Sequence, residues 1–107
     1  MKTIKNVDSK PEHFQDDIAP EVAATIPTYR KMFKAAVGMG LAKDGENAID
    51  LVQLGLKLRV DGDINLEDAE FKLLKERCSQ NPAQWTAHFH GQVMMKLKEA
   101  EKEGDKK

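Results

Sequence analysis

Apolar residues between Thr28 and Ala42 recur with the period of an α-helix. They fall on one stripe, made of Tyr29, Met32, Phe33, Ala36, Val37, Gly40 and Leu41. Such a stripe is typical of an amphipathic helix packed on a core, so we expect a first long helix over 28–42 with Thr28 as its N-cap. Glycine weakens helix interiors. The sequence therefore leaves open whether Gly40 lies within the helix, against a neighbouring backbone, or whether the helix ends near Gly38.

The next segment, 45–59, for which Asp44 is the expected N-cap, is defined by its few polar residues. A single narrow polar line runs along it at helical spacing, formed by Glu46, Asp50, Gln53 and Lys57. A helix that is apolar nearly all round has to be buried nearly all round. We therefore expect a central helix, or one covered by a second copy of the chain, with Leu51, Val52 and Leu56 nearly inaccessible.

Two further helices are predicted over 66–78 and 82–102, each from a cap followed by a periodic apolar pattern. Asn65 is the expected cap of the first. For the second, Asn81 is the expected cap, Pro82 the first helical residue and Gln84 the partner in a capping box. Apolar residues then follow at steps of four, at Trp85, Phe89, Val93 and Leu97.

The two ends of the chain carry no sustained period. Residues 1–19 are polar and predict a flexible or loosely docked arm. A short edge strand is possible at 2–7, but no nearby segment offers it a partner. A short helical turn is expected over 20–25, and residues 104–107 are expected to fray. The fold class that follows is all-α, a four-helix single domain over 20–103 with an N-terminal arm.

Composition narrows the classes of protein. The 107 residues suit one domain, and 40% hydrophobic residues are enough for one modest core. Seventeen basic residues against eighteen acidic ones leave a formal charge of -1, so no overall field would collect nucleic acid or anionic lipid. Cys78 is the only cysteine, which excludes an intrachain disulfide and favours a reducing compartment. The sequence contains neither a membrane-spanning apolar run nor a signal peptide, so we expect a cytoplasmic protein.

The loop at 61–63 has the Asp-Gly-Asp composition of a calcium-binding helix–loop–helix. In one alignment, however, Lys57 and Arg59 occupy the opening ligand positions. In the other, Leu66 replaces the required glycine and Lys72 replaces the bidentate acid. A hard cation needs several oxygen ligands at these positions, so we interpret the segment as a turn followed by a helix cap.

Other candidate chemistry is equally weak. His88 and His90 are two residues apart on a predicted helix and point away from each other, which excludes a shared metal ion. Cys78 lies near the carbonyl end of its helix, where a thiol is not activated, and is expected to be a core residue. We find no nucleotide-binding or serine-hydrolase motif. We therefore expect no metal, no cofactor and no enzymatic activity.

Nucleic-acid binding is the alternative function. Arg30, Lys31 and Lys34 form a basic patch on the outer face of the first long helix, and the turn at 42–47 gives the outline of a helix-turn-helix. The second helix would then have to read the major groove. It is the most apolar helix of the chain and offers few polar side chains for that task.

The favoured function is protein interaction. Glu70 and Arg77 are seven residues apart on the third helix and flank Leu73 and Leu74, so charges are set within an apolar face. These four residues are the predicted partner-binding site, and also the predicted seam of a homodimer in which Glu70 of one copy meets Arg77 of the other. A packed monomer with both charges at the rim explains the same pattern.

No family resemblance is evident. Compact chains without motifs are common among accessory proteins of phages and other mobile elements, so a helical adaptor, assembly factor or inhibitor is expected.

Overall fold

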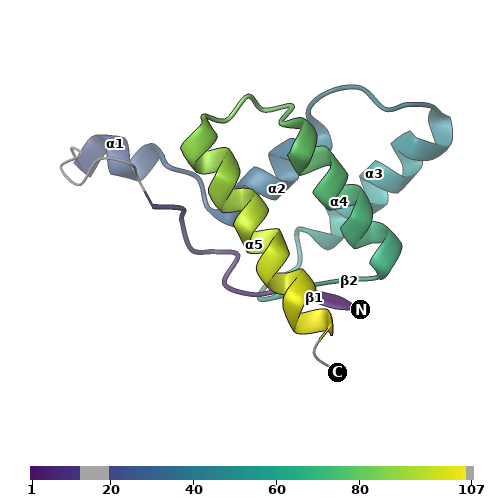
Figure 1. Ribbon diagram of the computed structural model, residues 1–107. Helices are drawn as coiled ribbons and strands as arrows, with labels where there is room; N and C mark the ends of the chain where they lie inside the picture. The colour runs from purple at the N-terminus through teal and green to yellow at the C-terminus, as the bar shows by residue number, and fades with distance from the viewer. Residues whose placement is uncertain (13–19, 106–107) are drawn as a thin grey trace.

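A computed structural model of the protein describes residues 1–12 and 20–105. Within these residues the element order is β1 (Lys2–Ile4), α1 (Pro20–Thr25), α2 (Tyr29–Gly38), α3 (Gly45–Lys57), β2 (Ile64–Leu66), α4 (Asp68–Gln80) and α5 (Ala87–Asp105) (Figure 1). The protein is largely helical, as the sequence predicts. The expected all-α class omits a small antiparallel sheet formed by β1 and β2.

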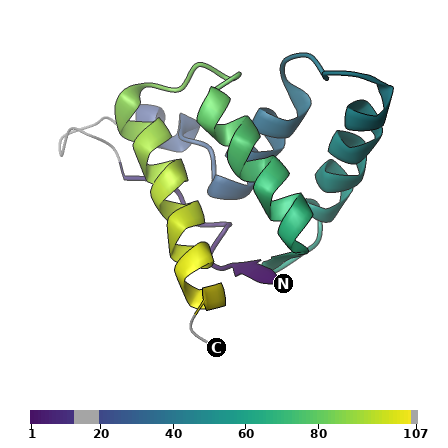
Figure 2. The same ribbon diagram turned by 45° about the vertical axis from the view of Figure 1, so that its right-hand side comes forward.

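The four longer helices surround one core. Helices α4 and α5 lie in front of α2, α3 stands on the far side of α4, and the sheet closes one end of the molecule (Figures 1 and 2). The largest fully buried side chains come from the sheet, from the segment after β1 and from all four of these helices: Ile4, Val7, Met32, Phe33, Leu54, Leu58, Ile64, Leu66, Leu74, Cys78, Val93 and Leu97.

The predicted starts of α2 and α3 are confirmed. The hydroxyl of Thr28 accepts a hydrogen bond from the Lys31 amide at 3.2 Å, and the Asp44 carboxylate accepts one from the Asn47 amide at 2.8 Å. Each cap satisfies an amide that has no partner within the helix. Helix α2 ends at Gly38, the earlier of the two ends that the sequence allows.

The predicted start of α4 is wrong. Asn65 lies in β2, where its side chain accepts a hydrogen bond from Thr3 on β1 at 2.7 Å, and the helix begins at Asp68. The Glu67 amide instead donates to the Glu70 side chain at 2.9 Å, which is one half of a capping box. The alternation of buried Ile64 and Leu66 around exposed Asn65 is a strand pattern.

The predicted start of α5 is also wrong. Asn81 ends α4 in the left-handed conformation, with φ 53°, a role in which asparagine is tolerated. Its side-chain oxygen accepts from the Trp85 amide at 2.8 Å and its side-chain nitrogen donates to the Trp85 carbonyl at 2.9 Å. This loop delays α5 until Ala87, and the helix then continues to Asp105, beyond its expected end.

Helix α3 is buried on one side, contrary to the prediction that it is covered nearly all round. Leu51, Leu54 and Leu58 face the core, whereas Val52 and Leu56 are exposed. The physical reason is the position of α3 at the edge of the molecule, where α2 and α4 cover only its inner side (Figure 1). The polar line along α3 is exposed, as expected.

The prediction of a flexible N-terminal arm is wrong for residues 1–12. Strand β1 pairs with β2 so that Ile4 lies opposite Ile64, and it lies beside the C-terminal half of α5 (Figure 2). Ile4 and Val7 are fully buried. These two residues anchor this polar segment in the core by their apolar side chains, so its composition alone gives little sign that it is packed.

Polar contacts hold the rest of this segment. The Asp8 carboxylate accepts from Arg30 at 2.9 Å, and this contact lowers the pKa of Asp8. The Glu12 amide donates to the Gln92 side chain on α5 at 2.7 Å, and the Gln92 amide donates back to the Glu12 carbonyl at 2.8 Å. Residues 13–19 of the predicted arm, and residues 106–107 of the predicted tail, lie outside the described residues.

Two glycines near the end of α2 make a matched pair for a stability test. Gly40 has φ +90°, and a Cβ there would lie 3.1 Å from the Arg77 guanidinium, whereas a Cβ on Gly38 would meet no atom within 4 Å. We expect Gly40→Ala to lower the free energy of unfolding by about 1–3 kcal/mol because of the backbone conformation. Gly38→Ala should be neutral or stabilising by up to about 1 kcal/mol. Urea denaturation checks both, and equal effects would contradict the account of Gly40.

Candidate protein-interaction surface

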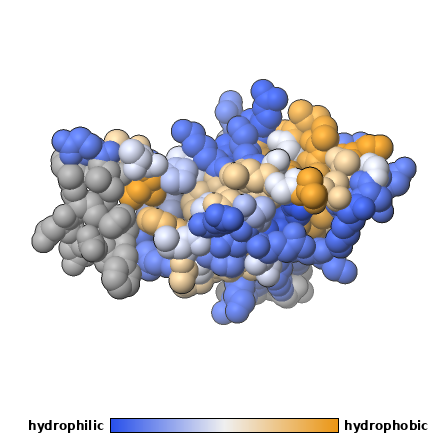
Figure 3. All heavy atoms as spheres, turned by 90° about the horizontal axis from the view of Figure 1, so that it is seen from above, coloured by the Kyte–Doolittle hydropathy of each residue, from blue (hydrophilic) through white to orange (hydrophobic). Residues whose placement is uncertain are grey.

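The outer side of α3 exposes large apolar residues. Ile49, Val52 and Leu56 are 51%, 64% and 57% exposed, and they share one side of the helix because they are three and four residues apart. Leu41, in the loop between α2 and α3, is 91% exposed. Seen from above, the hydrophobic atoms gather at the end of the molecule formed by α3 and this loop (Figure 3). We call these four residues the α3 face.

A groove between α2 and α3 borders the α3 face. Its volume is about 420 Å³, and Val52 and Leu56 form part of its lining. The α2 side contributes Val37 and Gly38. A Cβ atom on Gly55 of α3 would lie 3.9 Å from Cγ1 of Val37, so the two helices are close at this point. Small residues on both helices keep this groove shallow and apolar. A side chain or helix from another molecule would have access to the inner edge of the α3 face.

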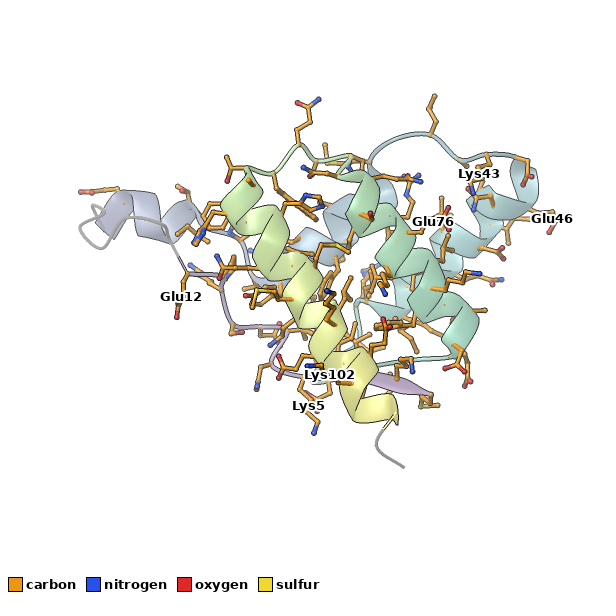
Figure 4. The ribbon with its side chains drawn as sticks, viewed as in Figure 1. Lys5, Glu12, Lys43, Glu46, Glu76 and Lys102 are labelled. Carbon is orange, nitrogen blue, oxygen red and sulfur yellow. The ribbon has the colours of Figure 1, made fainter. Side chains whose placement is uncertain are left out.

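Charges of opposite sign mark the two ends of the α3 face. Lys34 and Arg59, both exposed, line the groove beside the end of α3. Asp44 and Glu46, also exposed, lie at the start of the helix, and Glu46 projects from that outer end (Figure 4). The carboxylates lie where the helix dipole is positive and the cations where it is negative, so the dipole stabilises both pairs. Lys43, also exposed at the start of α3, is paired with Glu76 of α4 at 2.9 Å. Asp44 and Glu46 therefore leave this end acidic, while the middle of the face is apolar and the other end is basic.

The four residues of the predicted partner site do not form one exposed surface. Leu74 is fully buried and Leu73 is partly buried. Glu70 forms an ion pair with Lys57 of α3 at 2.7 Å. Partial burial raises the pKa of Glu70, but the hydrogen bonds from Lys57 and from the Glu67 amide lower it by more. Arg77 is only 7% exposed. The expected seam needs Arg77 at the surface, opposite Glu70 of a second copy, whereas a single copy buries Arg77.

Arg77 instead closes the carbonyl end of α2. Its guanidinium donates to the Ala36 carbonyl at 3.2 Å, to the Leu41 carbonyl at 3.0 Å and to the Met39 carbonyl. These groups belong to the last turn of α2 and the residues that follow it, where carbonyls have no partner within the helix. A buried cation at this end is further stabilised by the helix dipole. Arg77 is a structural residue.

Arg30 has a similar role at the end of α3. It is therefore separated from Lys31 and Lys34, the other two residues of the basic patch that suggested nucleic-acid binding. Its guanidinium donates to the carbonyls of Leu58, at 2.8 Å, and of Val60 and Gly62, and it also binds Asp8. Lys31 and Lys34 are exposed, but Arg30 is turned inward and is satisfied within the protein.

The histidines and the cysteine also have structural partners. The Nε2 atom of His90 lies 2.7 Å from the Cys78 carbonyl oxygen, and the Nε2 atom of His88 lies 3.1 Å from the Glu12 carbonyl oxygen. The two rings therefore contact different segments, as their spacing predicts. Among residues 1–12 and 20–105, no group of three His, Cys, Asp or Glu side chains is placed to hold a metal ion.

Burial makes the Cys78 thiol unreactive, which gives a pH prediction. It raises the pKa of Cys78 to about 12, so at pH 8 only about one molecule in 10⁴ carries the reactive thiolate. We expect no reaction with a thiol reagent in the folded protein at pH 8, and one thiol per chain after unfolding in guanidinium chloride. Rapid labelling of the folded protein would contradict the buried position.

Sequence reasoning missed all four residues of the α3 face as surface residues, and it predicted Val52 and Leu56 to be nearly inaccessible. The available signal was the excess of apolar positions in α3, from which we predicted cover on nearly every side of the helix. The error was to place the uncovered surface on α4, because a pair of charges flanking leucines looks the same in sequence whether it faces a partner or a neighbouring helix.

Comparisons with models of protein families, with curated proteins and with solved structures find no match. None of the helices in the described part of the chain has the length and apolar character needed to cross a membrane. Functional inference therefore depends on the surface of the protein itself.

Proposed function

We propose that this protein is a small helical protein-interaction module, an adaptor, assembly factor or inhibitor that acts by binding a partner protein through the α3 face. The observation that carries the proposal is the exposure of Leu41, Ile49, Val52 and Leu56 beside an apolar groove. Contiguous apolar surface of this kind is typical of interaction sites. The charged groups at its two ends would fix the orientation of a bound partner, which apolar contacts alone do not determine. We place this activity in the cytoplasm, where a single buried thiol is in keeping with a reducing environment.

A DNA-binding role receives less support. Of the three basic residues that suggested it, Arg30 is bound to backbone carbonyls and to Asp8. The helix that would enter the major groove presents Val52 and Leu56 to solvent, and neither side chain donates or accepts hydrogen bonds with base edges.

A capture experiment with paired variants tests the proposal. Val52→Glu places a charge in the middle of the α3 face, and Met95→Glu places one on α5, where Met95 is 69% exposed. Both positions are exposed, so both variants should fold, as circular dichroism would check. We expect a partner from a lysate of the source cells to bind the wild type and Met95→Glu, and to be lost with Val52→Glu. Partners that bind all three equally, or salt-dependent binding of generic duplex DNA without a protein partner, would overturn it.

A further inference from the structure

The α3 face has a charge pattern that is complementary to itself. Its acidic end, at Asp44 and Glu46, and its basic end, at Lys34 and Arg59, lie on either side of Val52. Glu46 and Arg59 are six and seven residues from Val52, so the apolar centre is nearly equidistant from both ends. A copy turned by 180° about an axis through this centre brings each acidic end to a basic end.

We propose that the occupant of the α3 face is a second copy of this chain, with the two α3 helices antiparallel about a two-fold axis near Val52. This inference rests on the proposed function and names the partner that uses the surface. An isologous pair of this kind is the commonest closed symmetry among protein oligomers. It covers the same apolar residues on both copies at once.

The antiparallel direction follows from the charges. A parallel pair would set Glu46 beside Glu46 and Arg59 beside Arg59, and like charges in contact are unfavourable. In the antiparallel pair, the leucine near one end of the face, Leu56, lies toward Ile49 of the other copy. Val52 lies next to Val52 at the axis.

The groove favours close approach of the second helix. Ala48 carries only a methyl group and Gly55 has no side chain, and both residues line the groove beside Val52. Short residues on a helix surface let another helix approach closely. A different protein would need an apolar stripe with a basic end and an acidic end in the matching order, which is the pattern that this chain already carries.

Sedimentation at tens of micromolar tests the oligomeric state of the full chain. We expect a species of twice the 12.0 kDa chain mass. Val52→Glu should weaken association by on the order of 100-fold, because it places a charge at the centre of an apolar interface, and Met95→Glu should leave it unchanged. A wild-type protein that sediments only as a monomer, or a dimer indifferent to Val52→Glu, would overturn the proposal.

Cysteine cross-linking tests the direction of the two helices. Val52→Cys should form an intermolecular disulfide under mild oxidation, and the buried Cys78 should not interfere. Glu46→Cys should not cross-link to itself, because helix rise of about 1.5 Å per residue separates the two positions by roughly 18 Å in the antiparallel pair. Strong cross-linking of Glu46→Cys to itself would indicate a parallel pair and overturn the arrangement.

Charge reversal gives an independent readout. Glu46→Arg and Arg59→Glu should each weaken association several-fold, and the double variant should restore it. A double variant as weak as the single ones would contradict the pairing of opposite ends.

Sedimentation and capture together separate the self-association from the proposed function. A monomer that still captures another protein through Val52 refutes only the self-association. A dimer that captures no other protein refutes only the wider role.

Discussion

Deletion of residues 1–10 is expected to abolish cooperative unfolding or to lower the free energy of unfolding by about 5 kcal/mol or more. The deletion removes two fully buried side chains, Ile4 and Val7, and each contributes about 1.5–3 kcal/mol by burial. It also removes the strand partner of β2 and the Asp8 contact to Arg30. Small domains have only about 5–15 kcal/mol of stability in total. Urea denaturation followed by circular dichroism measures the effect.

Point variants separate the core contribution from a general effect of shortening the chain. Ile4→Ala should cost about 2–5 kcal/mol, whereas Lys10→Ala, at an exposed position of the same segment, should change stability by less than about 0.5 kcal/mol. A truncated protein that unfolds like the wild type would mean that the N-terminal segment is the loose arm that its composition suggests.

Arg77→Met is expected to lower the free energy of unfolding by about 2–4 kcal/mol. Methionine keeps much of the buried aliphatic volume but donates no hydrogen bond, so three carbonyls at the end of α2 lose their partner. Lysine at this position retains the charge but lacks the planar fork that reaches several carbonyls, so Arg77→Lys should recover only part of the loss. Thermal and urea denaturation measure both variants.

Arg59→Met is the matched control for Arg77. It makes the same chemical change at an exposed position and should alter stability by less than about 0.5 kcal/mol at concentrations where the protein is monomeric. If both substitutions cost the same, the carbonyl contacts of Arg77 do not contribute to stability.

Local signals in the sequence predicted the parts of the fold that depend on neighbouring residues. The caps at Thr28 and Asp44 and the apolar stripe of α2 are each decided within a few residues, and the structure agrees with them. The strand pairing of Ile4 with Ile64 was not predictable in this way, because the two residues are sixty positions apart and each segment is only three residues long.

The candidate surface was predictable only in part. The number of apolar residues in α3 indicated a helix buried nearly all round, by this chain or by a second copy, but helical spacing alone does not say which side the rest of the protein covers. Arg77 shows the opposite difficulty. A cation among leucines suggests a charged interface, and only the position of the α2 carbonyls reveals that its partners are within the same chain.

The contact between β1 and α5 has a consequence for the order of events during synthesis. The first strand leaves the ribosome long before the last helix, yet each covers apolar surface of the other (Figure 2). The buried side chains of Ile4 and Val7 therefore remain without the core residues of α5, Val93 and Leu97, until α5 has been synthesised. Contacts between distant segments slow folding, because a long loop has to be closed first. We expect the nascent chain to acquire its protected core only after α5 has left the ribosome, with α2, α3 and α4 able to form local structure earlier.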